Sequence, residues 1–297
     1  MLRRPTQRTL HMDEAAFKPA PGTLYVVATP IGNLRDIPLR ALDVLRAADC
    51  VAAEDTRVTE ILLRHYGIGS KLLPLHEHNE RAQSARVAAL LSEGKSVALV
   101  SDAGTPAISD PGTVLVGAVR AAGHSVVTVP GPSALAAALS LCGWLAGPFR
   151  FEGFLPSKPA ARRNALEALA AEQAALVFYE APHRIAECVA DLAASLGGAR
   201  RITIARELTK RFESVHECAL ADAPAWLAGD PDRLRGEFVL IVEGAPAQDV
   251  KDLGPEDARI LRALLAELPA SRAARVAAEL TGKPRAAFYE AALAQKE

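Results

Sequence analysis

The segment of this chain that carries most chemical information is residues 101–112, SDAGTPAISDPG, which directly follow the apolar run SVALV. The segment contains two glycines, two prolines and two aspartates. Glycine lets the backbone approach a ligand closely, and proline fixes the backbone so that little conformational entropy remains to be lost on binding. This composition is typical of a loop that holds a small molecule, although a plain turn between a strand and a helix uses the same residue types.

Three further loops of this kind occupy equivalent places in the chain. The segments ATPIGN, AEDTR and VPGPSA each end an apolar run that reads as a buried strand. Ligands of parallel α/β sheets bind outside the carboxyl ends of the strands. The four loops are therefore expected to converge on one cleft, which favours the binding interpretation over four unrelated turns.

Strands and helices alternate through the first half of the chain. This alternation predicts a mostly parallel sheet covered by helices on both faces. Asp36 is expected to cap the first helix, in which Leu39, Leu42 and Leu45 recur at helical spacing. The predicted strands are 23–29, 49–55, 71–79, 96–100 and 125–130, and the other predicted helices are 59–66, 81–92, one ending at 122 and one within 131–141.

The pattern changes near Gly147, where we place a domain boundary. Predicted strands at 176–180, 201–210 and 236–244, with helices at 184–195 and 224–227, have a hairpin-like spacing that indicates a mixed sheet. A linker at 245–255 precedes three amphipathic helices at 256–268, 271–281 and 285–294. The expected organisation is a disordered tail (1–20), an N-terminal α/β domain (21–147), a C-terminal α/β domain (148–245) and a helical tail module (246–297).

Composition sets bounds on partners and location. Lys and Arg total 34 against 35 Asp and Glu, so no global field attracts nucleic acid or a membrane, and an RNA contact must be a local patch.

Four scattered cysteines without a CxxC pair favour reduced thiols in a cytoplasmic protein. The longest apolar stretch, 134–149, is shorter than the ~20 residues that span a bilayer. The tail lacks the apolar core of a signal peptide, and Met12 is an alternative start.

Common ligand motifs are incomplete or absent from the sequence. GKS at 94–96 resembles the end of a P-loop, but Ala89 stands where that motif needs glycine. No GxGxxG fingerprint follows the first strand, and no GxSxG hydrolase elbow occurs. His76 and His78 are expected on one face of a strand but lack a third ligand at a recognisable spacing, so no metal site is predicted.

Eight motifs in a fixed order carry a family resemblance between residues 22 and 244. They are ATPIGNLRDI, AEDTR, HEHNE, SDAGTPAISDP, VPGPSA, FYEAPHR, ARELTK and GEFVLIVEG. In this order they resemble the tetrapyrrole-methylase-like superfamily of S-adenosylmethionine-dependent methyltransferases. More narrowly, they resemble its ribosomal branch, which methylates the ribose 2'-hydroxyl of a cytidine in small-subunit (16S) RNA. The resemblance implies a two-domain α/β enzyme, usually a homodimer, that holds S-adenosyl-L-methionine between its domains and needs no metal.

The same resemblance implies which residues meet the cofactor. Tyr179 and Glu180 match a strand end near the adenosine, and the counterpart around residues 208–210 aligns less closely. Tetrapyrrole enzymes have an aspartate where this chain has Thr105, which counts against a porphyrin precursor as substrate. The expected cofactor-binding residues are Pro30, Asp102, Ala103, Gly104, Thr105, Ile108, Ser133, Ala134, Tyr179 and Glu180.

The implied reaction sets what the other side chains must do. Methyl transfer from a sulfonium to a hydroxyl is an in-line displacement that needs alignment and exclusion of water. A ribose hydroxyl is a weak nucleophile, so a carboxylate is expected to accept its proton. We predict Asp55 for this role, with Arg57 orienting either that carboxylate or a phosphate. The carboxylates near the cleft, each with an alternative role as a cap, turn residue or ion-pair partner, are Asp36, Asp55, Asp102, Asp110 and Glu180.

Basic residues of the second half are the candidates for RNA contacts. Lys158, Arg162 and Arg163 are predicted to form a mobile arm over the cleft, and Lys210 to contact phosphate, against the alternative of solvated surface charge. The folded small ribosomal subunit is the expected partner, because a chain with 5% aromatic residues offers few stacking platforms for a free single strand. Two alternatives remain: a relative that methylates a tetrapyrrole or a protein residue, and a cofactor-binding RNA module without catalysis.

Overall fold

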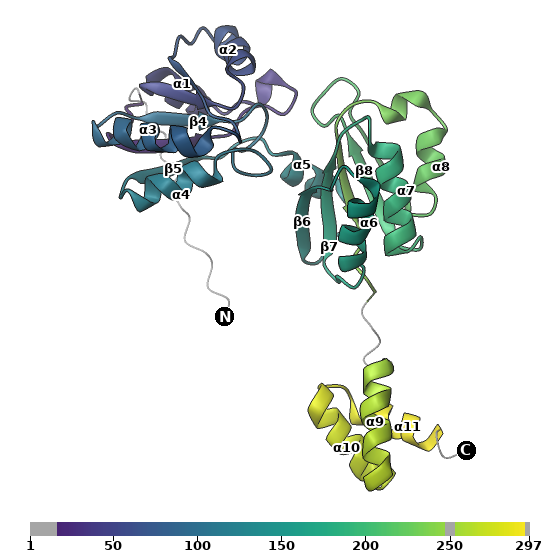
Figure 1. Ribbon diagram of the computed structural model, residues 1–297. Helices are drawn as coiled ribbons and strands as arrows, with labels where there is room; N and C mark the ends of the chain where they lie inside the picture. Colours follow the sequence, from purple (N-terminus) through teal and green to yellow (C-terminus); the bar gives the residue numbers. More distant parts are fainter. Residues whose placement is uncertain (1–16, 247–252, 295–297) are drawn as a thin grey trace, which may run out of the picture.

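The computed structural model describes residues 17–246 and 253–294 (Figure 1). The predicted disordered tail and Met12 lie mostly outside the described residues. Within that tail, the Phe17 ring packs edge-on against Tyr25 with 5.8 Å between ring centroids, and the Ala20 N–H donates a hydrogen bond to Tyr25 Oη at 2.8 Å. The prediction of disorder is therefore wrong for residues 17–20, which pack onto the first strand.

The N-terminal domain is built on a parallel sheet, as predicted. Its five strands lie in the order β3-β2-β4-β1-β5, and each neighbouring pair is parallel. All residues of β2 and β4 are buried, because helices cover both faces of the sheet. The strands are β1 (Thr23–Val27), β2 (Cys50–Ala53), β3 (Leu72–Pro74), β4 (Val97–Val100) and β5 (Ser125–Val129).

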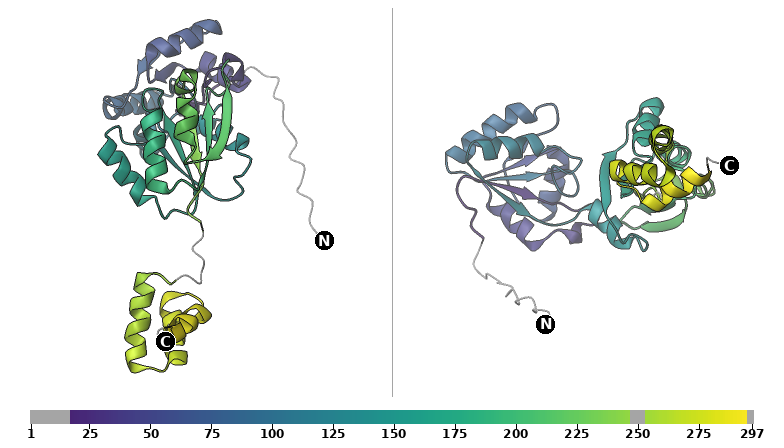
Figure 2. Two further views of the ribbon diagram at one scale, coloured as in Figure 1. Left: turned by 90° about the vertical axis from the view of Figure 1, so that its right-hand side faces the viewer. Right: turned by 90° about the horizontal axis from the view of Figure 1, so that it is seen from below.

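Two pairs of helices form the outer layers of this domain (Figure 2). The helices α1 (Leu39–Ala47) and α2 (Thr56–His65) pack against the sheet face that includes Tyr25. The helices α3 (Glu80–Ser92) and α4 (Thr113–Ala121) pack against the opposite face, which includes Leu24. Successive side chains of β1 thus point alternately into the two cores, because side chains alternate between the faces of a strand.

Two local predictions for this domain are wrong. Residues 76–79 form a turn after β3, in which Asn79 Oδ1 accepts a hydrogen bond from the His76 N–H at 2.9 Å, so His76 and His78 do not share the face of a strand. Asp36 ends a short 3₁₀ turn, and Pro38 is the N-cap of α1. Asp36 thus lies two residues before the N-cap and does not occupy the capping position.

The C-terminal domain contains the predicted mixed sheet. Its strand order is β6-β7-β10-β8-β9, in which β6 and β7 are parallel and the other pairs antiparallel. The helices α6 (Pro159–Ala168), α7 (Ile185–Leu196) and α8 (Ala223–Ala228) cover one face (Figure 1). The strands are β6 (Phe149–Phe154), β7 (Ala175–Glu180), β8 (Arg201–Arg206), β9 (Ser214–Ala219) and β10 (Phe238–Val242).

The helix α5 (Ala134–Leu141) covers the other face of this second sheet. Its residue Ala138 packs in one cluster with Val177 of β7 and Ile241 of β10. The helix follows the last strand of the first sheet yet completes the core of the second domain. A boundary at Gly147 is therefore too late: by packing, the chain passes between domains in the loop before α5.

The predicted C-terminal helices are confirmed as α9 (Pro255–Glu267), α10 (Ala270–Thr281) and α11 (Arg285–Ala294). They share a small core that includes Leu261, Ala277 and Phe288, and Gly282 ends α10 in the left-handed region at φ 72°. Six of the eleven residues of the predicted linker, 247–252, lie outside the described residues. None of the helices in the described ranges 17–246 and 253–294 is long and apolar enough to cross a membrane.

Candidate active site

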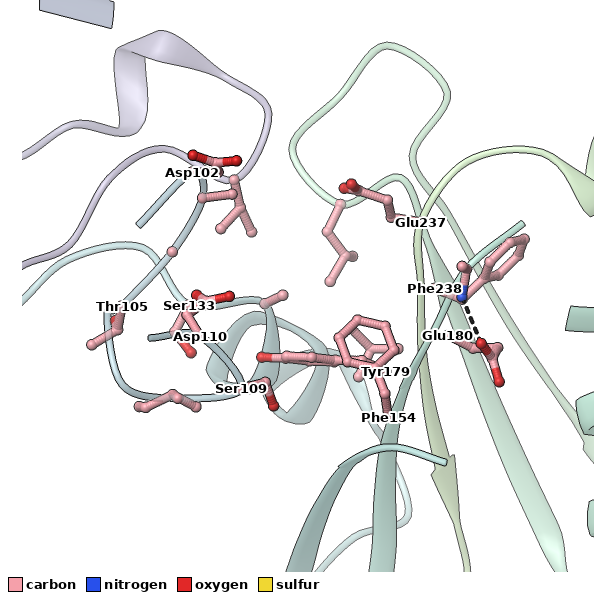
Figure 3. Close-up of a pocket in the computed structure, with 18 of the residues that line it drawn as sticks. Asp102, Thr105, Ser109, Asp110, Ser133, Phe154, Tyr179, Glu180, Glu237 and Phe238 are labelled. Atoms are coloured by element: carbon pink, nitrogen blue, oxygen red, sulfur yellow. Dashed lines mark hydrogen bonds between the residues drawn. The ribbon is translucent and has the colours of Figure 1, made fainter. Parts of the chain in front are cut away.

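A pocket of about 330 Å³ lies between the two domains, at the carboxyl ends of the parallel strands (Figure 3). The lining residues include Ile31 after β1, Glu54 after β2, residues 102–105 and 108–110 after β4, and Ser133 after β5. The prediction that four loops converge on one cleft is confirmed. The loop after β3, which carries the two histidines, contributes no lining residue.

The second domain supplies the opposite wall. Tyr179 at the end of β7 lies along the pocket with its hydroxyl toward Ser133, and the Phe154 ring packs against it with 5.6 Å between centroids (Figure 3). The Leu135 N–H of α5 donates a hydrogen bond to Tyr179 Oη at 3.1 Å. Burial raises the pKa of Tyr179, so its hydroxyl stays protonated at neutral pH. This wall is formed by Phe154, Tyr179, Glu180, Ala181, Pro182, Leu208, Lys210, Glu237, Phe238 and Val239.

The loop after β4 is held close to the loop after β1. Thr29 N–H donates to Gly104 O at 2.8 Å and Gly104 N–H donates to Thr29 O at 3.0 Å. Gly104 has φ 78°, a left-handed conformation that glycine adopts without steric cost. The Thr105 hydroxyl donates to Pro132 O at 3.2 Å, which ties the same loop to the one after β5. Gly104 therefore supplies the left-handed backbone conformation that lets the SDAGTP loop pair with Thr29.

The far end of the loop touches the second domain. Ser109 has φ 64°, an uncommon conformation for a residue with a side chain, and it lies against a β-bulge of β6. A β-carbon built on Gly153 in that bulge would lie 2.8 Å from Ser109 Oγ. Glycine at position 153 therefore permits the contact that closes this side of the pocket.

A buried glutamate anchors the same loop, which sequence reasoning missed. Glu80 Oε1 accepts hydrogen bonds from the backbone N–H groups of Gly112 at 2.9 Å and Leu115 at 3.0 Å. The carboxylate of α3 thus caps the N-terminus of α4, where a negative charge is stabilised. The sequence gives no local signal for this contact, because Glu80 is distant along the chain.

Three carboxylates give the pocket a negative potential. Burial, followed by the charge of Glu54, raises the pKa of Asp110 to about 6. Burial also raises the pKa of Glu54 and that of Asp102. Each carboxylate disfavours the charge on its neighbours, and a bound cation relieves this repulsion. The site therefore favours a positively charged ligand.

Asp55, the predicted base, does not line the pocket. As the N-cap of α2 its Oδ1 accepts a hydrogen bond from the Arg57 N–H at 2.8 Å, and the Arg57 guanidinium donates to Oδ1 and Oδ2 at 3.0 and 2.6 Å. The hydrogen bonds from Arg57 lower the pKa of Asp55 to about 2. A carboxylate so weakly basic and so fully bonded is a poor proton acceptor, and this corrects the prediction. Arg57 does orient Asp55, as expected.

Nine of the ten expected cofactor-binding residues line the pocket, and Pro30 is replaced there by its neighbour Ile31. Their contact with a cofactor stays a prediction. Glu180 contributes to the wall while its carboxylate points away from the pocket (Figure 3). Its Oε1 accepts a hydrogen bond from the Ala181 N–H at 2.8 Å and lies 3.3 Å from Arg184 Nε, so the alternative role as an ion-pair partner is confirmed.

The predicted mobile basic arm is wrong. Arg162 is only 1% exposed, and its guanidinium donates from Nε to Asp191 at 2.6 Å and contacts Glu187 at 3.3 Å. It therefore joins α6 to α7 inside the domain. Arg163 lies 3.5 Å from the same Asp191, and Lys158 is exposed at the start of α6. None of the three lines the pocket.

Lys210 lies in the pocket wall instead of on an open surface. Its Nζ donates to Glu207 Oε1 and to Glu237 Oε2, both at 2.8 Å. Burial opposes the charge on Lys210, but the two carboxylates outweigh burial and raise its pKa. Its predicted phosphate contact is untested. In the part of the chain that the structure describes, no three His, Cys, Asp or Glu side chains form a metal-binding group.

Comparisons with known proteins agree with this architecture. Residues 23–224 match the Tetrapyrrole (Corrin/Porphyrin) Methylases, and residues 251–296 match the RsmI C-terminal HTH domain. The Ribosomal RNA small subunit methyltransferase I of Xylella fastidiosa is 54% identical over 269 residues, 91% of this chain and 98% of that protein. The protein of the same name from Escherichia coli O157:H7 is 50% identical over 275 residues, 93% of this chain and 96% of that protein.

Solved structures show the same fold at low identity. The methyltransferase CobJ superposes with a TM-score of 0.57 at 22% identity, covering 79% of this chain and 98% of its own. The uroporphyrin-III-C-methyltransferase of Thermus thermophilus has a TM-score of 0.52 at 24% identity, covering 75% and 94%. The predicted fold class and family resemblance are confirmed. The chain belongs to the tetrapyrrole methylase family of S-adenosylmethionine-dependent methyltransferases, together with the ribosomal RNA small subunit methyltransferases I.

Proposed function

We propose that the chain transfers a methyl group from S-adenosyl-L-methionine to the ribose 2'-hydroxyl of a cytidine in small-subunit ribosomal RNA. The observation that carries this proposal is the pocket: a cation-favouring site formed by four strand-end loops. It occurs in a chain about half identical, over nine tenths of its length, to proteins named for methylation of this RNA. Thr105, in place of the aspartate expected for tetrapyrrole enzymes, supports the ribosomal substrate.

The residues of the pocket fit the cofactor. S-Adenosyl-L-methionine supplies an electrophilic methyl group on a positively charged sulfur. Glu54, Asp102 and Asp110 would favour that charge, because the raised pKa of each carboxylate reflects burial that a cation compensates. Tyr179 and Phe154 offer aromatic surface on which a flat heterocycle packs. The walls align the reactants and exclude water, which is what an in-line displacement requires.

Asp110 replaces Asp55 as our candidate for the proton acceptor. It lines the pocket, whereas the Asp55 carboxylate is bonded to Arg57 outside it. A general base works best when its pKa lies near the working pH, and the pKa of Asp110 of about 6 meets that condition. The proton of the ribose hydroxyl would pass to this carboxylate as the new carbon–oxygen bond forms and the carbon–sulfur bond of the donor breaks, with its electron pair left on sulfur.

The partners and location follow from the same reaction. We propose a homodimer, which would bury large apolar side chains such as Leu39, 81% exposed, and Ile61, 69% exposed. We also propose a cytoplasmic protein, supported by four free cysteines, three of them buried. The C-terminal helices, which match a helix-turn-helix domain, are a further candidate for RNA contact.

Methyl transfer to isolated ribosomal subunits tests the proposal. Purified protein is incubated with isotope-labelled S-adenosyl-L-methionine and small subunits from cells that lack the modification, and the labelled nucleotide is mapped. Label on a cytidine ribose supports the proposal. Label on a tetrapyrrole or a protein residue in parallel incubations would favour a different branch of the family, and cofactor binding without any transfer would favour a non-catalytic module.

A further inference from the structure

The loop between β8 and β9, residues 207–213, places an exposed aromatic ring beside the pocket. Phe212 is 63% exposed, and the Arg211 guanidinium carbon lies 5.5 Å from the centroid of its ring. Lys210, two residues earlier, lines the pocket. Two residues of chain span at most about 7 Å, so the Cα atom of Phe212 lies within that distance of the Cα atom of Lys210, whose side chain reaches the pocket. A single exposed apolar side chain is common on protein surfaces, so the case for a ligand rests on the fixed loop and the cation beside this ring.

The conformation of this loop is fixed by several contacts. Glu207 and Thr209 have left-handed φ angles of 51° and 66°, which persist only where the surroundings enforce them. The Arg206 guanidinium donates hydrogen bonds to Phe212 O at 3.2 Å and to Asp232 O at 2.7 Å. The loop is thus pre-organised, and little entropy would be lost when a ligand meets the ring.

The neighbouring cations Lys210 and Arg211 differ in their ion pairs, and this difference favours a phosphate ligand at Arg211. Lys210 is neutralised by Glu207 and Glu237. Among the residues described, no acidic side chain forms an ion pair with Arg211, so its charge remains available. A free guanidinium next to an exposed ring is the combination that single-stranded nucleotides recognise, through the phosphate and the base respectively.

We propose that Phe212 and Arg211 form the docking platform for the acceptor nucleotide of the RNA. The base stacks on the Phe212 ring, and Arg211 pairs with an adjoining phosphate. A nucleotide whose ribose enters a pocket must leave its own stack, and an aromatic side chain replaces part of the stacking that is lost. This inference rests on the proposed function and names the element that receives its substrate.

Variants of the loop test the platform against a matched control. Phe212→Ala removes the ring, and Phe212→Tyr keeps a stacking face. The control is Phe149→Ala, which removes a ring that is 46% exposed. Phe149 lies at the opposite end of β6 from the pocket residue Phe154. Methylation of small subunits gives kcat/KM, and calorimetric titration gives the affinity for S-adenosyl-L-methionine. Phe212→Ala is expected to lower kcat/KM about 5-fold to 150-fold, the range of one lost base–aromatic stack, with unchanged cofactor affinity.

The control variants decide the interpretation. Phe212→Tyr and Phe149→Ala are expected to retain kcat/KM, and Arg211→Ala to reduce the salt dependence of RNA binding by about one phosphate contact. The platform is overturned if Phe212→Ala behaves like Phe149→Ala, or if it only changes the mass in sedimentation, which would show a contact between copies of the chain. If the wild-type protein itself transfers no methyl group to the subunit, the proposed function fails, a result distinct from failure of the platform.

Discussion

The side chain of Lys210 crosses from the second domain and packs against the backbone of Gly32 in the first. A β-carbon built on Gly32 would lie 2.4 Å from Cγ of Lys210. The lysine cannot easily move aside, because its Nζ is held by Glu207 and Glu237 at 2.8 Å each. Ile31, the neighbour of Gly32, lines the pocket. This contact therefore brings the first loop against the opposite wall of the pocket.

Gly32→Ala is expected to weaken cofactor binding. The added methyl group must displace the Lys210 side chain, and overpacking of this kind costs ~1–3 kcal/mol. If the substitution destabilises the cofactor-binding arrangement of the cleft by this amount, the affinity for S-adenosyl-L-methionine falls about 5-fold to 150-fold. Calorimetric titration with S-adenosyl-L-methionine measures it. Gly67→Ala is the control, because Gly67 also has a positive φ, 62°, while a β-carbon there meets no atom within 4 Å; equal affinities in the two variants would contradict the role of the contact.

Asp110→Asn is expected to reduce turnover and to remove one limb of the pH profile. The pKa of Asp110 is about 6, so the wild-type carboxylate is increasingly protonated, and inactive as a base, as the pH falls through 6. In the wild type kcat/KM, which reports the pKa values of the free enzyme, should therefore rise about 10-fold between pH 5 and 7 and then level off, whereas Asp110→Asn should lose the ~10²–10⁴-fold typical of general base catalysis. Values of kcat/KM between pH 5 and 8 measure both effects. A variant that keeps the wild-type profile would exclude Asp110.

The same substitution is expected to stabilise the cofactor-free protein at neutral pH. The folded pKa of Asp110 lies above its ordinary value of 3.8, so the folded state binds the proton more tightly than the unfolded state. The ionised Asp110 carboxylate therefore lowers the free energy of unfolding. This effect is fully present above pH 6 and disappears as the pH falls below about 4. Thermal unfolding should show a higher Tm for Asp110→Asn than for the wild type at pH 7.5, and no difference at pH 3.5. A lower Tm at pH 7.5 would mean that the carboxylate makes a stabilising contact.

Asp55→Asn is expected to keep most of the turnover. Asparagine caps a helix as well as aspartate does, so the start of α2 stays intact, and the pocket does not include this side chain. Asp55→Ala should instead lower the Tm, because the cap is lost. Turnover and Tm of the two variants, measured side by side, check this. Loss of turnover in Asp55→Asn with an unchanged Tm would return Asp55 to the role of base.

Arg162→Ala is expected to lower the free energy of unfolding. It leaves Asp191 without its buried partner, and breaking a buried ion pair costs about 3–5 kcal/mol. Lys158→Ala, at an exposed position in the same segment, should be nearly neutral. Urea unfolding of both variants measures the difference. If instead Arg162→Ala left stability intact and weakened RNA binding, the arginine would belong to the RNA surface.

The N-terminal domain was predictable because its three central strands, β1, β2 and β4, are almost wholly buried, and because its strands end in loops with strong turn residues. β6 and β9 lacked such a signal. β6 contains the bulge at Gly153, which interrupts its pattern, and the exposed and half-buried residues of β9 include His216 and Glu217. The packing of α5 on the second sheet was also hidden, because an apolar helix does not specify which of two sheets it covers.

The candidate site was predictable where backbone conformation matters and unpredictable where long-range charge decides. Gly104 and Ser133 fall where their motifs place them. Arg162 reads as a surface residue in the sequence, but its partner Asp191 lies on another helix. Likewise, nothing near Asp110 in the sequence indicates that burial beside Glu54 raises its pKa.

A crystal structure with S-adenosylhomocysteine tests the central claim most directly, since this product occupies the donor site without reacting. The account predicts the ligand between Gly104 of the first domain and Tyr179 of the second, with its sulfur on the side of Asp102 and Asp110. A ligand bound elsewhere on the chain, or crystals and titrations that show no binding at all, would contradict it.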